Sequence, residues 1–137
     1  MIVQHMTTSF KEEILKGVHD LTTDVLKIAL YDAQADLSAA TTVYTTTNEI
    51  TGANYTAGGK VMTGVTVTKS GTTAYVGFDN VAWVPAAFTA RGALIYNSSK
   101  GNKSIAVLDF GSDIFGNPNF TVQMPVATAT DALLRIA

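Results

Sequence analysis

The chain after residue 24 is divided into short segments in which apolar and polar residues alternate, and turn-forming residues separate them. Such alternation is typical of half-buried β-strands, and no helical pattern separates one segment from the next. We therefore expect a mainly β fold, an antiparallel β-sandwich of jelly-roll-like type with about eight strands, rather than a parallel doubly wound sheet. The expected strands are Val25–Tyr31, Lys60–Thr68, Thr72–Phe78, Val81–Val84, Phe88–Tyr96, Ser104–Phe110, Asn119–Met124 and Ala132–Ile136.

One segment near the N-terminus is predicted to be helical. Ser9 and Glu12 have the spacing of a capping box, in which each side chain satisfies a backbone N–H of the first turn. The apolar residues that follow recur at helical spacing, and they are Phe10, Ile14, Val18 and Leu21. These signals predict one short helix over about Phe10–Asp20, with Gly17 as its weakest position.

The remaining segments set the domain organisation. Lys69, Ser70 and Gly71 predict a tight hairpin, because glycine supplies the positive φ that such turns need. We expect residues 1–8 to form a flexible tail and residues 9–137 to form a single β-sandwich domain. Asp32–Tyr55 and the residues before Ser9 have little periodic apolar content, so we expect both to contact other subunits rather than the domain's own core.

Composition excludes several classes of protein. The 137 residues carry a net charge of −2, and only 15% are charged, against about 25% in an average domain. We therefore expect no nucleic-acid partner. No apolar run approaches the roughly 20 residues of a membrane-spanning helix, and no secretory signal is apparent at the N-terminus. The chain has no cysteine, which excludes disulfides and thiolate chemistry. The low charge would suit a surface with close protein neighbours.

No group of residues has the spacing of a catalytic or metal site. His5 and His19 are far apart in the sequence, and we interpret them as surface or helix-packing residues. The acidic residues considered for paired-carboxylate chemistry are best explained as turn or edge residues, and they are Asp79, Asp109, Asp113 and Asp131. Gly58–Lys60 and Gly101–Ser104 are not followed by the helix that a phosphate loop requires. We therefore predict no enzyme activity, no cofactor and no metal.

The aromatic residues leave a carbohydrate-binding role to be considered. The alternation directs Phe78, Phe110 and Phe120 inward, where they would be part of the core. Trp83 and Tyr96 could instead form an exposed platform for a sugar, although core packing is the expected role for both. Arg91 is expected either to reach a subunit contact or to cover apolar surface with its stem.

Several runs resemble small virion proteins of tailed bacteriophages, and the resemblance extends from about Ser9 to the C-terminus. The matching runs are Val25–Tyr31, Ala35–Thr42, Tyr55–Lys60, Thr89–Asn97 and Ala106–Gly111. The resemblance implies a capsid decoration or cement protein that is made in the host cytoplasm and sits on the outer surface of the virion. Its partners would be the major capsid protein and further copies of itself, as a dimer or trimer. The alternative is a tail-associated module that binds a receptor or a glycan.

Overall fold

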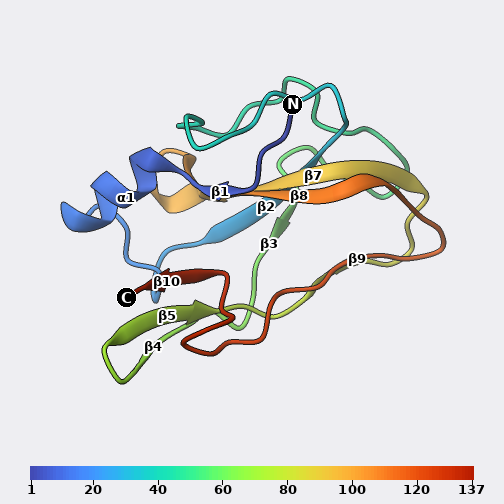
Figure 1. Cartoon of the computed structure of the whole chain (residues 1–137). Helices are drawn as coiled ribbons and strands as arrows, with labels where there is room; N and C mark the ends of the chain where they lie inside the picture. Colours follow the sequence, from blue (N-terminus) through green and yellow to red (C-terminus); the bar gives the residue numbers. More distant parts are fainter.

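The computed structural model describes residues 1–137 and consists of ten β-strands with one α-helix (Figure 1). The elements in chain order are β1 (His5–Met6), α1 (Thr8–Leu15), β2 (Leu26–Tyr31), β3 (Lys60–Val61), β4 (Thr66–Ser70), β5 (Thr73–Gly77), β6 (Val81–Trp83), β7 (Phe88–Asn97), a 3₁₀ turn at Ser98–Lys100, β8 (Lys103–Gly116), β9 (Phe120–Val122) and β10 (Leu134–Ile136).

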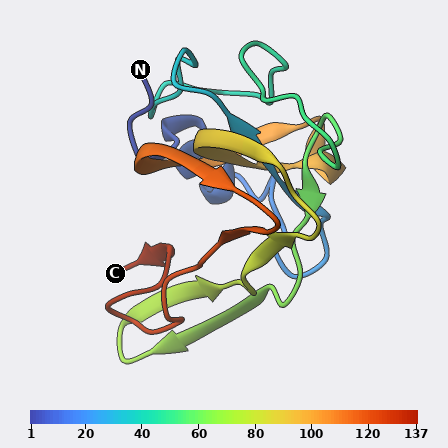
Figure 2. The ribbon, with the colours of Figure 1, turned by 90° about the vertical axis from the view of Figure 1, so that its right-hand side faces the viewer.

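The strands form an antiparallel, β-sandwich-like fold, as the sequence predicts. One layer is a five-stranded sheet in the order β1-β8-β7-β2-β3. The opposite layer is divided into a three-stranded sheet, β10-β5-β4, and a two-stranded sheet, β6-β9. Viewed from the side, the large sheet lies above β4, β5 and β10 with a space between them (Figure 2). All strand pairs in the three sheets are antiparallel.

Apolar side chains pack on both faces of the large sheet. A cluster of 21 buried residues fills the space between the layers and includes Leu26, Ile28 and Leu30, the face of β2 that the alternation predicts. A second cluster of eight buried residues lies on the other face and includes Ala29, Tyr31 and Leu94. The central strands β2 and β7 are therefore covered on both sides.

The predicted strand Lys60–Thr68 is two strands in the structure. β3 pairs with β2 in the large sheet, whereas β4 pairs with β5 in the small sheet. Between them Gly64 adopts a φ of 64°, and the chain crosses from one layer to the other. The predicted β4–β5 hairpin is confirmed, with Ser70 opposite Thr73 and Gly71 at a φ of 60°.

The helix begins and ends earlier than predicted. Its N-cap is Thr7, whose Oγ1 accepts from the backbone N–H of Phe10 at 3.4 Å, so the expected capping role of Ser9 is wrong. Ser9 instead lies in the first turn, where its Oγ is 3.3 Å from the hydroxyl of Ser104. The helix ends at Leu15 because Gly17 has a φ of 71°, a left-handed conformation that terminates helices.

Two segments expected outside the core are part of it. Residues 1–8 lie against the sheet instead of extending as a tail, since β1 pairs with β8 and Ile2 is buried. In the 32–55 segment, Ala35 and Leu37 are buried in the second cluster with Ile2. The premise that these segments have too little apolar content to join the domain's own core is therefore wrong. Their apolar residues lack periodicity because loops, not strands, carry them.

Candidate functional site

An apolar groove lies at one end of the molecule, between α1, β1 and β10. Its main hollow has a volume of about 620 Å³, and the apolar side chains that line it include Met6, Phe10, Ile14, Leu15 and Ile136. Leu15 is 87% exposed and Ile136 is 56% exposed. A second hollow of about 420 Å³ adjoins it below the helix and extends to β5. We call these two hollows together the α1 groove.

The fold leaves the groove open because the helix is anchored on only one side. Phe10 is 3% exposed and joins the main core, and Ile14 packs partly against that core. Leu15, the next residue, points away from this stripe into solvent. Across the groove, Leu134 of β10 is buried while Ile136 is exposed. Exposed apolar side chains gathered around a hollow are typical of a surface that another protein covers.

The charged side chains that line the main hollow are cationic. They are Lys11 and Arg135; the imidazole of His5 lies beside them, and no acidic side chain lines this hollow. The carboxylates of the helix are engaged elsewhere, since Glu12 pairs with Lys16 and Glu13 with His19, each at 3.0 Å. Lys11 forms no ion pair. The main hollow therefore combines apolar surface with positive charge, whereas Asp20 lines the second hollow.

A chain of polar contacts behind the groove holds the helix and the following loop against β7. Asn97 accepts from the backbone N–H of Ser99 through Oδ1, so its Nδ2 donates to His19 Nδ1 at 2.9 Å and to Asp24 Oδ2 at 2.7 Å. His19 is then protonated at Nε2, which donates to Glu13 at 3.0 Å. Both ring nitrogens are thus engaged within the fold, and the interpretation of His19 as a helix-packing residue is confirmed by its ring contact with Phe10.

Asp24 is the anionic end of that chain of contacts. It forms an ion pair with Lys100 at 2.8 Å, and it also accepts from the backbone N–H of Asp20. Burial raises the pKa of Asp24, but the hydrogen bonds from Lys100, Asn97 and Asp20 outweigh this and hold the pKa at about 2. The arrangement connects three segments that are distant in sequence, and it serves to stabilise them.

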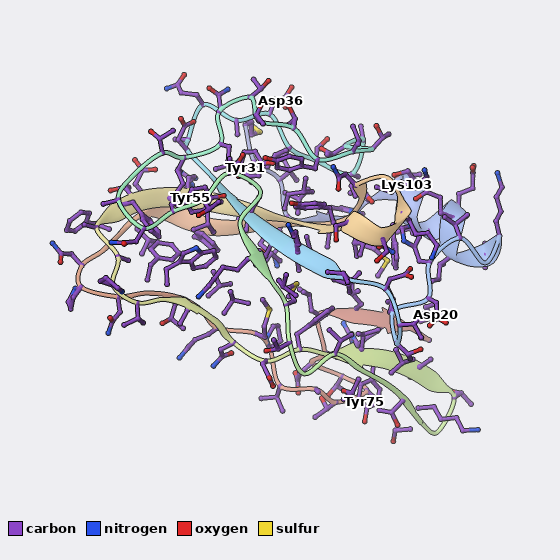
Figure 3. All side chains as sticks on the ribbon, turned by 180° about the vertical axis from the view of Figure 1, so that it is seen from behind. Asp20, Tyr31, Asp36, Tyr55, Tyr75 and Lys103 are labelled. Atoms are coloured by element: carbon purple, nitrogen blue, oxygen red, sulfur yellow. The ribbon has the colours of Figure 1, made fainter.

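Around Glu49, tyrosine side chains fasten the 32–55 segment to the sheet. The carboxylate accepts from the hydroxyls of Tyr44 and Tyr55, each at 2.6 Å, and from the backbone N–H of Gly58 at 2.8 Å. The hydroxyl of Tyr55 accepts in turn from Leu30 N. Figure 3 shows Tyr55 and Tyr31 together beside this segment. Burial and the nearby Glu49 carboxylate raise the pKa of Tyr96 to about 12.

The acidic residues singled out in the sequence do not converge on one site. Asp79 bonds the hydroxyl of Thr63, and Asp131 bonds those of Thr128 and Thr130. Asp109 accepts from the backbone N–H of Gly111 and pairs with Arg91 at 3.2 Å, and the hydrogen bond from Gly111 is the main reason that its pKa is lowered. Arg91 is therefore bound within its own chain. Asp113 is exposed and forms no ion pair.

The predicted core aromatics are inside, and so are the two that could have formed a sugar platform. Trp83 is 3% exposed and Tyr96 is 2% exposed, the latter stacked on Tyr44. Phe120 is buried, while Phe78 and Phe110 are partly buried against the core. Phe115 is the aromatic side chain with a large exposed surface, 65%. The α1 groove was not predicted, and its one local signal in the sequence is Leu15, an apolar residue outside the helical stripe.

Neither helical segment has the length and apolar character needed to traverse a bilayer. No three acidic or histidine side chains are grouped as a metal site would require. Searches of protein-family models, curated proteins and solved structures found no match to this chain.

Proposed function

We propose that this chain is a virion structural protein of a tailed bacteriophage, a capsid decoration or cement protein. In this role it binds the outer surface of the assembled coat in many copies, associates with itself and stabilises the head. Its partners are then the major capsid protein and further copies of this chain. The alternative, a tail-associated module for a receptor or glycan, would need an exposed aromatic platform, and Trp83 and Tyr96 are buried.

The α1 groove is the observation that carries this proposal. A small domain with a net charge of −2 and an open apolar hollow gains most from contact with another protein, because burial of apolar surface is the main favourable term in association. The resemblance of several runs to small phage virion proteins supports the capsid as the setting. Many modest contacts on a repeating lattice raise the effective affinity without any single strong site.

A decoration protein of this kind stabilises the shell by mass action, since it binds the assembled coat and not its dissociated subunits. Phage particles produced without the gene for this chain should rupture at a lower temperature than intact particles. The rupture temperature is measured by the fluorescence of a dye that binds the released DNA. Adding the purified protein back should restore the rupture temperature, whereas an unrelated protein of similar size and charge should not. Equal rupture temperatures in all three samples would contradict the proposal.

The same particles distinguish the alternative. Deletion of a decoration protein leaves adsorption to the host intact. Deletion of a receptor- or glycan-binding module abolishes adsorption. Binding to the coat should also change little between low and moderate salt, because apolar contacts are not screened by ions. Lost adsorption together with an unchanged rupture temperature would favour the tail-associated role.

A further inference from the structure

The far end of β8 presents an apolar and acidic segment that pairs with β7 along one edge and with no strand along the other. β1 pairs with β8 only at Ala106 and Val107, so the same edge of β8 is free of β1 beyond these residues. Here Phe115 is 65% exposed and Ile114 is 41% exposed. The carboxylate of Asp113 forms no ion pair, and Arg91 is held by Asp109.

Asp113 and Phe115 share one face of this strand. Ile114 lies opposite the buried Ala90 of β7 and lines a hollow between the layers, so its side chain points inward. Phe115 lies opposite the exposed Thr89. Because side chains alternate along a strand, Asp113 and Phe115 both point outward, about 7 Å apart. The segment therefore presents a carboxylate and an aromatic ring side by side.

The α1 groove presents the complementary pair at nearly the same spacing. Lys11 and Leu15 are separated by one helical turn and lie on one face of α1, with about 5–6 Å between their Cβ atoms. Lys11 is an unpaired cation, and Leu15 is 87% exposed. The two sites match in charge and in apolar character: a carboxylate can meet Lys11 while a ring covers Leu15.

The two sites lie at opposite ends of the molecule. The β7–β8 hairpin has Asn97 opposite Lys103 at the end near α1 and Phe88 opposite Gly116 at the other end. Figure 1 shows α1 at the left and the distant end of β7 and β8 at the right. We infer that the β8 segment of one copy, with Asp113 and Phe115, docks into the α1 groove of the next copy.

Such a contact is head-to-tail, and it leaves one free groove and one free β8 segment on every open assembly. Two copies that lie antiparallel can satisfy both sites in a closed dimer, and otherwise the contact closes into a larger ring or continues as a chain. The inference rests on the self-association included in the proposed function and names its interface. It is tested on the purified protein alone, so that a monomeric protein that still stabilises capsids would overturn the inference and leave the proposed function standing.

The first experiment measures the mass of the full chain by sedimentation over a range of concentrations. Wild type should self-associate into dimers or larger assemblies. Phe115→Thr and Leu15→Gln should each weaken self-association by at least about tenfold, because each removes a central apolar contact. Val84→Thr is the matched control, since Val84 is 67% exposed but lies in neither site. A monomeric wild type overturns the inference, and so does an equal loss of self-association in the control.

Mixing the two variants tests the head-to-tail geometry. Phe115→Thr keeps an intact groove and Leu15→Gln keeps an intact β8 segment, so the mixture should form a one-to-one heterodimer that cannot grow further. An interface made of the same patch on both copies would not be restored in this way. A mixture that stays as monomeric as each variant alone overturns the inference.

Charge reversal tests the ion pair with variants that do not alter the apolar contacts. Asp113→Lys and Lys11→Glu should each weaken assembly, because each places like charges together. An equimolar mixture should assemble again, since every contact between unlike variants then joins opposite charges. Circular dichroism of each variant establishes that it is folded. Folded variants that assemble like wild type, or a mixture that fails to recover, would show that this pairing does not occur.

Discussion

At the scale of single residues, Glu49 shows how one side chain fastens a long loop. Its carboxylate accepts three hydrogen bonds, from Tyr44, Tyr55 and Gly58. Glu49→Gln replaces one acceptor oxygen by an amide NH₂ group, which cannot accept a hydrogen bond from Tyr44, Tyr55 or Gly58. We therefore expect the free energy of unfolding in urea to fall by about 1–3 kcal/mol. Glu12→Gln is the control, because Glu12 forms only an exposed pair with Lys16, and it should leave the midpoint unchanged. Equal midpoints for both variants would contradict the role of Glu49.

Asp24 should make stability depend on pH in the acid range. Its pKa is held at about 2 in the folded protein and rises to about 3.9 on unfolding. The stabilisation is therefore complete above about pH 4 and is lost as the pH falls through 2, a change of about 1–2 kcal/mol. Asp24→Asn should remove this part of the dependence, whereas Asp36→Asn, an exposed residue in no ion pair, should retain it. The measurement is the free energy of unfolding at pH 2 to 6, and identical profiles would disprove the assignment.

At the scale of elements, the 32–55 segment acts as a covering layer of the domain. Leu37 is 1% exposed, and its backbone bonds Met1 and Val3 of the N-terminal segment. Leu37→Ala should therefore cost about 2–4 kcal/mol in a denaturant titration, as for a core position. Val43→Ala, from the same segment but 46% exposed, should cost about 0.5 kcal/mol or less. If Leu37→Ala is as mild as its control, the segment does not contribute to the core.

At the scale of the whole molecule, one cluster joins all three sheets. Trp83 of β6, Phe88 of β7 and Leu134 of β10 belong to the same 21-residue core. We therefore expect one cooperative transition, in which Trp83 fluorescence and far-UV circular dichroism change together. Leu134→Ala should shift both signals equally to lower denaturant, whereas Val67→Ala, exposed on the same small sheet, should shift neither. A dichroism change that precedes the fluorescence change would mean that β4, β5 and β10 unfold separately.

The features that the sequence by itself determined are local ones. Alternation located the strands and the inward face of β2, and Gly71 located the β4–β5 turn, because each signal depends on neighbours along the chain. The alternation of Lys60–Thr68 was equally regular, yet it did not reveal the crossing between sheets at Gly64. A strand keeps its alternation when it changes partner, so the pattern contains no information about the sheet to which it belongs.

Only the tertiary structure decided what covers the outer face of the large sheet and what is left open. Ile2 and Leu37 are buried because two non-periodic segments meet on β2 and β7, and no local pattern marks such a meeting. The α1 groove arises in the same way. β10 lies across from Leu15, and nothing in this chain covers the side chains of Leu15 and Ile136. Burial depends on which surfaces come together in space, and that depends on the path of the whole chain.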